Sequence, residues 1–515
     1  MSFQSIINNL SINSSDNIIK IEDNNYRFDV SLASTDGKLV KLKFAAIVDF
    51  KIVDSLDIPW TEGYLIFENI DDVVESGEFI GRSDDGTPKK AFVPYTFRGD
   101  GRDLLVVNIC PQLGEDDDLD AIPGESSPRG MVYTYSIYNT EDITAENDSI
   151  KLKKLYFRDY ACGILLEKNS FFSTGSFRPG TSNTDRSLLT GQVIQLIIDR
   201  TFYEDYGIPQ KFSQDWDFGS STIFYSSNPS YKAMDDIRYL LDYHVSSEQT
   251  DNSPCILRKE RNDIWTLIPI SSYFKQGYYA GNSSFGDLGG SRLTETFILP
   301  NETTDDTYNE QPSRNPSVSL FADELADYNT IHSFQFSNMT STDTSESMVT
   351  HFVHNYDPAQ KTFSVDLAQN NIYRNDEIYR QNFVGGFKGI QAPAKSNLTY
   401  NQIRALHKDV RHHFNPNTNN FQRLNSGRNR ALLASIFLNN TISFRVRGNT
   451  ARTAGKFITI SRNDSSIDNS FDNKIMGTYL IVKVEHCFGQ GRYYNNMICT
   501  KTYNTEQNNT FNGVL

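Results

Sequence analysis

The sequence is poor in cysteine and shows no cysteine pairing pattern. Of its 515 residues only five are cysteines, which are Cys110, Cys162, Cys255, Cys487 and Cys499. An odd number without any C-x-x-C spacing indicates neither a zinc knuckle nor a dithiol redox motif. Cys487 and Cys499 could face each other across the last predicted hairpin. The wide scatter nevertheless favours buried thiols in a protein that folds in a reducing cytosol.

The sequence also shows no pattern typical of a targeting segment or a membrane-spanning segment. The first residues, MSFQSIINNLSINSS, lack a basic region followed by an apolar core, so we expect no secretory signal. No apolar run approaches the roughly 18 residues that a membrane-spanning helix requires. We therefore expect no membrane span.

Motifs for the common enzyme chemistries are absent. The sequence contains no G-x-x-x-x-G-K-[ST], no H-E-x-x-H and no G-x-S-x-G. The stretch from Gly99 to Leu104 fails the dinucleotide fingerprint because its last position is leucine. Acidic pairs such as Glu75 and Glu78 occur in any acidic chain, and nothing selects one as an acid–base couple. We therefore expect no catalytic residue and no cofactor.

Two clusters of possible metal ligands fall short of a site. Asp116, Asp118 and Asp120 have the spacing of a calcium loop, but Ala121 and Ser127 replace its glycine and its bidentate glutamate. We therefore interpret that stretch as a solvated acidic loop. The histidines offer no better set. His351 and His354 point to opposite faces of a predicted strand, whereas a set of three lies in a polar stretch and leaves its role open: His407, His412 and His413. No metal site is predicted.

One part of the chain lacks acidic residues altogether. The formal net charge is −15 and the pI is about 5.1, which disfavours a general nucleic-acid binder. Yet no Asp or Glu occurs between Arg411 and Asn463, where Arg and Lys recur. This basic block is consistent with a solvated face, with a docking surface for an acidic partner, or with DNA contact. The predicted interface residues are Arg428, Arg430, Arg445, Arg447, Arg452 and Lys456.

The patterns that are present favour a β-rich, α+β protein. Aromatic residues make up 12% of the chain, and 515 residues exceed what one core usually holds. Residues 1–178 contain alternating segments separated by turn signals, which predict an antiparallel β-barrel domain with an acidic loop at 114–130. The predicted strands cover 25–33, 38–56, 61–70, 102–110, 131–140 and 150–168.

A helical period then appears and gives way again to strands. Residues 179–275 predict an α+β domain, with helical stripes that include Val193, Ile197, Ile237 and Leu240, followed by a strand pair. The remaining predicted units are a linker at 276–318, a β-strand segment at 319–370, a polar insertion at 371–425 and a C-terminal β-barrel at 426–515.

The C-terminal pattern is the most informative. A helix-like segment at 428–440 precedes a strand in which Ile442, Phe444 and Val446 share one face and Arg445 and Arg447 share the other. Glycines mark the turns between this strand and three more. The third strand is predicted to place one set of residues on a single face: Leu480, Val482, Val484, His486 and Phe488.

This order of elements resembles the terminal barrel of phage baseplate hub proteins of the T-even type, which are related to the VgrG spike bases of type VI secretion. The residues that carry the resemblance are Gly448, Gly455, Lys456, Gly477, Tyr479, Val484, His486 and Tyr494. The segments Ile256–Arg258 and Asp263–Ile270 also resemble a strand pair in the second domain of that family.

The resemblance implies two tail-tube-like barrels around an α+β domain. It further implies a non-enzymatic homotrimer in the virion, folded in the host cytoplasm, whose ring joins the contractile tail tube to the central spike. Expected partners are the spike, the tail tube proteins, the tape measure protein and DNA passing through the channel without sequence-specific binding. The alternative from a different class is a tail-fibre or receptor-binding β-protein, which would present exposed aromatic pockets.

Overall fold

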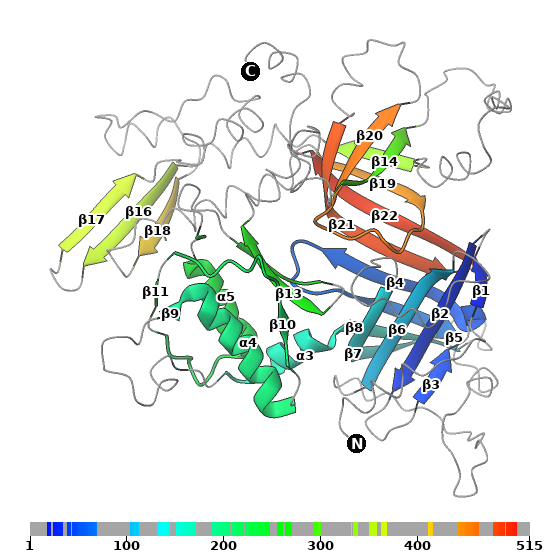
Figure 1. Cartoon of the computed structure of the whole chain (residues 1–515), viewed down its shortest axis with the longest axis horizontal. Helices are drawn as coiled ribbons and strands as arrows, with labels where there is room; N and C mark the ends of the chain where they lie inside the picture. Colours follow the sequence, from blue (N-terminus) through cyan, green and yellow to red (C-terminus); the bar gives the residue numbers. More distant parts are fainter. Residues whose placement is uncertain are drawn as a thin grey trace, which may run out of the picture.

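We describe a computed structural model of the chain, in which the strands outnumber the helices (Figure 1). The description covers residues 18–21, 24–33, 39–42, 44–68, 103–112, 131–144, 151–170, 173, 188–206, 209–220, 222–223, 225–244, 246–247, 255–260, 263–269, 293–299, 331, 333–337, 350–357, 362–367, 410–415, 441–462, 477–489 and 491–501. The prediction of a β-rich fold is confirmed. Among these residues, no helix is both long and apolar enough to cross a membrane.

The N-terminal strands form an antiparallel sheet around one apolar core. Its order is β1-β2-β6-β7-β8-β5-β4, with β3 paired to β2. The strands are β1 (Ile18–Ile21), β2 (Asn24–Ala33), β3 (Leu39–Leu42), β4 (Ile47–Ser55), β5 (Glu62–Glu68), β6 (Asp103–Gln112), β7 (Met131–Thr144) and β8 (Lys151–Asp159), and a 3-10 turn (Phe44–Ala46) precedes β4. Alternation explains the packing: Phe50 and Ile52 of β4 enter the core, and Lys51 faces outward.

The strand predicted at 150–168 is wrong in its second half. The strand stops at Asp159, and α3 (Tyr160–Glu167) follows directly. The Asp159 side chain accepts a 2.8 Å hydrogen bond from the Ala161 amide, which satisfies a free donor of the first helical turn. The apolar run at 160–166 therefore belongs to a buried helix.

The α+β part packs helices against a small sheet. Helices α4 (Thr190–Tyr206) and α5 (Ala233–Tyr243) share an apolar core with α3, as the helical stripes predicted. The strand pair is present as β12 (Cys255–Lys259) and β13 (Ile264–Pro269), which is flanked by β10 (Lys211–Phe212). A separate short pair joins β9 (Leu188–Leu189) and β11 (Thr222–Ile223).

The C-terminal strands surround a third core. They comprise β14 (Leu293–Leu299), β15 (Ser333–Ser337), β19 (Thr441–Arg447), β20 (Phe457–Arg462), β21 (Gly477–Gly489) and β22 (Arg492–Lys501). Ile442, Phe444 and Val446 are buried in this core and Arg445 is exposed, which confirms the predicted alternation of β19.

The predicted face of β21 is wrong at two positions. A register shift between Ile481 and Lys483 inserts one extra residue into the strand. Tyr479 and Ile481 therefore share the core with Val484, whereas Leu480 and Val482 turn to the opposite side. Strict alternation from Leu480 to Phe488 could not anticipate that bulge.

Strand β21 also joins the N-terminal and C-terminal halves into one sheet. It pairs antiparallel with β4 from Phe50 to Ser55, and the β21–β22 hairpin lies beside the blue N-terminal strands (Figure 1). Phe488 and Tyr493, at the tip of the hairpin, are buried in the N-terminal core. Among the described strands no pairing closes the sheet, so the two predicted barrels stay a prediction.

The segments predicted between the α+β part and the C-terminal strands are described only in part. A small sheet joins β16 (Thr350–Asp357) to β17 (Thr362–Leu367) and to β18 (Val410–Asn415), so the polar insertion contains one strand. The acidic loop 114–130, the linker 276–318 except for β14, and the helix at 428–440 lie outside the described residues.

Four cysteines carry free, buried thiols, as predicted: Cys162, Cys255, Cys487 and Cys499. Cys487 lies opposite Tyr494 and Cys499 lies opposite Ile481, so the two are not cross-strand neighbours. Burial raises the pKa of the Cys487 thiol to about 11, which keeps it protonated at neutral pH.

Candidate functional site

Strand β12 carries two consecutive basic residues that are both buried. Arg258 is 6% exposed and Lys259 is 5% exposed. Because neighbouring side chains of a strand point to opposite faces, the two cations reach different parts of the molecule. Buried cations without partners would cost several kcal/mol each, so their partners define the site.

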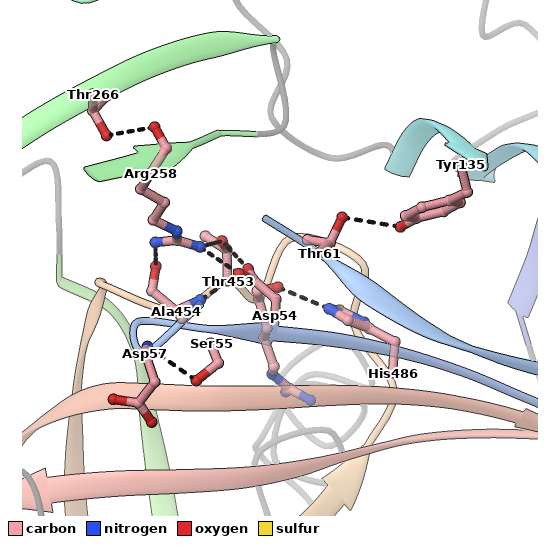
Figure 2. A network of polar contacts seen from close by, with 11 residues as sticks. Asp54, Ser55, Asp57, Thr61, Tyr135, Arg258, Thr266, Thr453, Ala454 and His486 are labelled. Atoms are coloured by element: carbon pink, nitrogen blue, oxygen red, sulfur yellow. Dashed lines mark hydrogen bonds and ion pairs between the residues drawn. The ribbon is translucent and has the colours of Figure 1, made fainter. Parts of the chain in front are cut away.

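Arg258 ties three distant segments together (Figure 2). Its guanidinium donates to the Asp54 carboxylate at the end of β4 and to the Ala454 carbonyl in the turn after β19. The Thr453 hydroxyl lies 3.3 Å from the guanidinium and donates to Asp54 Oδ2 at 2.6 Å. The Ala454 amide donates to the same oxygen at 3.1 Å. Asp54 is thus fully hydrogen-bonded although it is only 2% exposed.

Lys259 makes the second link of the junction. Its ammonium donates to both oxygens of Asp159 at 3.1 Å, and lies 2.7 Å from the Asp263 carboxylate. The Tyr160 ring lies 4.5 Å from the same ammonium. Burial alone would lower the pKa of Lys259, but the two carboxylates raise it well above the ordinary value. Lys259 therefore stays charged and fixes β12 to the cap of α3.

The turn after β19 is held by a third polar cluster. His486 Nε2 lies 3.1 Å from the Arg452 carbonyl, and its Nδ1 lies 2.8 Å from the Tyr493 hydroxyl and 3.0 Å from Asn495 Nδ2. Since a carbonyl only accepts, we assign the proton of the neutral ring to Nε2. The cluster joins the turn to both strands of the β21–β22 hairpin.

The four predicted interface residues that the structure describes differ in exposure. Arg445 is exposed; its Nε donates to Asn496 Oδ1 at 3.0 Å, and its guanidinium carbon lies 4.3 Å from the centre of the Tyr494 ring. Arg447 and Lys456 are half-buried, and the Lys456 ammonium donates a 3.3 Å hydrogen bond to the Ala451 carbonyl. Arg428 and Arg430 lie outside the described residues.

Arg452, another predicted interface residue, is buried within the chain. It is only 2% exposed, and its guanidinium donates to the Arg447 carbonyl and to Asn495 Oδ1, the latter at 2.9 Å. The guanidinium carbon also lies 5.0 Å from the centre of the Phe297 ring. The side chain thus ties the turn to its own domain. Charge counting along the sequence could not separate it from the exposed Arg445.

Arg445 belongs to a polar face that crosses the joined sheet. On this outer face, Arg445, Asn496 and Glu485 lie opposite one another in the cross-strand register. Lys51, Tyr64 and Tyr156 form a second such row, and Lys51 is a diagonal neighbour of Glu485 across the β21–β4 pair. Glu485 lies 2.7 Å from the Lys51 ammonium and 2.8 Å from that of Lys483. Beside Arg445 the face contains an open hollow of about 350 Å³, which is lined in part by Phe334, Met497 and Ile498.

The histidines of the polar stretch do not form a described site. His412 and His413 lie in β18, where the structure describes the strand but not these side chains, and His407 lies outside the described residues. The same holds for the pair of His351 and His354 in β16. Their roles stay open.

Comparisons with known proteins give structural likeness only. No family profile matches the sequence, and a search of curated proteins gives no match. The fold is similar to a tail protein from Neisseria meningitidis MC58, with 9% identity, a TM-score of 0.46, and coverage of 93% of this chain and 98% of that one.

Two further solved structures are similar to the chain at a comparable level. A prophage tail protein from Shewanella oneidensis gives 9% identity, a TM-score of 0.45, and coverage of 92% and 98%. A Francisella PdpA–VgrG complex gives 9% identity and a TM-score of 0.40 over 96% of this chain and 60% of that one. Phage tail proteins and type VI secretion components are thus among the similar structures. Likeness at this level does not by itself assign a function.

Proposed function

We propose that this chain is a structural subunit of a phage baseplate hub, without enzymatic activity. In this role three copies form a ring that joins the contractile tail tube to the central spike and lines the channel for DNA ejection. The partners are the spike, the tail tube proteins and the tape measure protein, and the site of action is the virion tail.

One observation carries the proposal. The N-terminal and C-terminal strands form a single sheet through β4 and β21, and the buried junction around Arg258 fixes the α+β part against it. A ring that transmits force between a tube and a spike needs subunits whose parts do not move independently. The net charge of −15 also suits a channel wall that must not retain DNA.

The edges of the sheet supply a means of assembly. In the described sheet, β1 and β15 stand at the ends of the main strand order, and each has one strand neighbour, as do the branch strands β3 and β14. An exposed edge offers unpaired backbone donors and acceptors to another chain. Pairing between copies, edge to edge, would satisfy those groups and close a ring. Two residues of the motifs that resemble hub proteins make packing contacts here. Gly448 packs directly against the Tyr493 ring, and His486 hydrogen-bonds to the Arg452 carbonyl in the turn after β19.

Electron microscopy and sedimentation test this proposal directly. We expect class averages of the purified chain, alone or with its spike protein, to show a threefold ring with a central opening. Analytical ultracentrifugation should give the mass of a trimer under the same conditions. A monomer in both preparations contradicts the hub assignment. Lysis of peptidoglycan by the pure chain would contradict the proposal that it has no enzymatic activity.

One observation favours the alternative of a receptor-binding tail-fibre protein. Several large aromatic side chains of the α+β part are exposed, namely Phe218, Tyr203, Tyr231 and Tyr239, with Tyr203 reaching 62%. Exposed aromatics are typical of carbohydrate and protein binding surfaces. A fluorescently labelled chain that decorates host cells, and loses this binding after Tyr203→Ala, would support the alternative. Ring formation without cell binding would exclude it.

A further inference from the structure

Three potential metal ligands meet inside the α+β part, away from the junction. They are Asp217 in the loop before β11, His244 directly after α5, and Cys255 at the first position of β12. One ligand atom from each side chain lies within 4.8 Å of the other two, and all three residues are buried. The residues are far apart in sequence, so the fold alone brings them together.

Two distances between potential ligand atoms lie near those of a tetrahedral site, and they run to the two different oxygens of Asp217. His244 Nε2 lies 3.6 Å from Asp217 Oδ1, and Cys255 Sγ lies 3.8 Å from Asp217 Oδ2. Ligand bonds of about 2.0–2.3 Å place neighbouring ligand atoms of a zinc ion roughly 3.3–3.8 Å apart. A cation that takes one Asp217 oxygen would draw the three ligand atoms together from separations of up to 4.8 Å.

The ligand types narrow the choice of metal. Calcium and magnesium take oxygen ligands almost exclusively, so an imidazole and a thiol disfavour both ions. A carboxylate, an imidazole and a thiolate together match zinc, which uses all three. The cluster supplies three protein ligands and leaves the fourth position to a water molecule.

The surroundings hold the carboxylate in place. Asp217 accepts hydrogen bonds from the Gly219 amide at 2.7 Å, from the Ser247 amide at 3.0 Å and from the Ser246 hydroxyl at 2.6 Å. Such outer contacts are the usual means of orienting a metal-binding carboxylate. The other two ligands are anchored as well, since the His244 amide bonds to the Leu241 carbonyl and Cys255 pairs with Pro269 across β12 and β13.

The same residue types also occur in cysteine nucleophile triads, but the geometry differs. In a triad the thiol meets the imidazole and the carboxylate orients the far side of the ring. Here both the imidazole and the thiol approach the carboxylate. Cys255 is moreover 6% exposed and belongs to the apolar core of the α+β part. A substrate would have no access to that sulfur without local opening.

We propose that Asp217, His244 and Cys255 bind a structural zinc ion. Binding releases the thiol proton to solvent, and the resulting thiolate and the carboxylate offset the charge of the cation. The ion would fasten the end of α5 to the start of β12. Because Arg258 and Lys259 follow on the same strand, the ion would also fix the position of the buried junction. This inference does not depend on the proposed function.

Metal analysis of the full chain tests the site. After purification, removal of metal with a chelator and exchange into metal-free buffer, we expect zinc to bind with a stoichiometry of one per folded chain, measured by mass spectrometry of metal content. Zinc should raise the midpoint of thermal unfolding. Cobalt(II) should produce the visible bands of a tetrahedral site and a near-ultraviolet thiolate band, which reports the sulfur ligand directly.

Variants separate this site from other thiols. Cys255→Ser and His244→Asn should each weaken zinc affinity at least tenfold, whereas Cys487→Ser, a buried cysteine on β21, should bind zinc like the wild type. The cobalt spectrum of the wild type needs no variant and therefore stands even if a substitution fails to fold. A folded wild-type chain that binds no zinc, or a cobalt complex without a thiolate band, overturns the proposal. A purely hydrogen-bonded cluster is then the correct account.

Discussion

At the scale of single residues, the junction depends on charges that have left water. Arg258 and Asp54 are 6% and 2% exposed, and the loss of hydration is offset only because every oxygen of Asp54 has a donor. Such a pair adds little net stability. Removing one partner is nevertheless costly, because the remaining charge stays buried without solvent or a counter-charge. The pair therefore selects one arrangement of the three segments that it joins.

Replacing Arg258 with methionine should expose that dependence. The substitution keeps an unbranched apolar stem but removes the guanidinium. Asp54 then stays buried with only the Thr453 hydroxyl and the Ala454 amide as donors. We expect a loss of about 3–5 kcal/mol in the free energy of unfolding, measured by urea denaturation. The double variant Asp54→Asn with Arg258→Met should lose less than the sum of the two single changes. Arg238→Met is the control, because Arg238 is 58% exposed and should change stability by less than about 0.5 kcal/mol. Equal effects of the two single arginine variants would contradict the account of the junction.

A carboxylate on the outer face should produce a defined pH dependence. Burial alone would raise the pKa of Glu485, but hydrogen bonds and charge from Lys483 and Lys51 lower it below the ordinary value. A lowered folded-state pKa gives stability that is present above the unfolded-state pKa of about 4.3 and is lost as the pH falls below it.

The variant Glu485→Gln removes that titration. It should be less stable than the wild type at pH 7, and its stability should fall less steeply between pH 4.3 and lower values, with urea denaturation at each pH as the measurement. Glu141→Gln, which changes an exposed glutamate bonded to Tyr156 at 3.0 Å, serves as the matched control. Parallel acid limbs for wild type and Glu485→Gln would contradict the prediction.

At the scale of elements, the β21–β22 hairpin is the central piece because it contributes to two cores. Its outer part packs Ile481, Val484 and Met497 in the C-terminal core, and its tip places Phe488 and Tyr493 in the N-terminal core. The stacked rings of Phe488 and Tyr493 lie 4.0 Å apart. The bulge near Val482 shifts the alternation of β21 by one residue. Ile481 on one side of the bulge and Val484 on the other therefore both face the C-terminal core, and Phe488 reaches the N-terminal core.

Gly448 offers a sharp test of this tip. A Cβ added there would lie 2.3 Å from the Tyr493 ring, which Phe488 and the His486 bond hold in place. Gly448→Ala should therefore cost about 1–3 kcal/mol in the free energy of unfolding, the usual range for overpacking. In a Tyr493→Leu background the same change should cost clearly less. Gly491→Asn is the control: its φ is +74° with no atom within 4 Å, and asparagine tolerates that conformation. A near-neutral Gly448→Ala would mean that the tip is loosely packed.

The elements themselves were largely predictable from the sequence, and their contacts were not. Alternation located β19 and the helical period located α4 and α5, because those patterns depend on neighbours along the chain. The sequence also contains the neighbours Arg258 and Lys259, but basic residues in a strand normally indicate solvent-exposed positions. Their buried carboxylate partners, Asp54 and Asp159, lie 204 and 100 positions away in the sequence. Asp217, His244 and Cys255 likewise have no spacing motif that a reader of the sequence could find.

At the scale of the whole molecule, the contacts that hold the chain together are separate from the surfaces that the proposed assembly would use. The junction and the two-core hairpin hold the three parts together from within, whereas the outer face presents a row of polar and aromatic side chains to the outside. Among the described residues, the exposed positions of that face and the ends of the sheet are candidates for contacts between copies. Of the predicted interface residues, Arg445 is the described one that is exposed, and it stands beside the open hollow.

A charge reversal at Arg445 tests whether that face takes part in assembly. Its guanidinium contacts only Asn496 and Tyr494 among the described contacts, so Arg445→Glu should leave the fold intact by circular dichroism. Acidic residues outnumber basic ones by 64 to 49, so a neighbouring copy offers many carboxylates as partners. Repulsion should then weaken assembly by roughly 2–5 kcal/mol if the pair is buried between copies, and by much less at a rim. Arg447 is left unchanged because its side chain is half-buried. Sedimentation at several concentrations gives the association constant, and Arg238→Glu, an exposed reversal on α5, is the control. If Arg445→Glu assembles like the control, the basic side chain of β19 faces solvent in the assembly, and the ends of the sheet at β1 and β15 become the contact to test next.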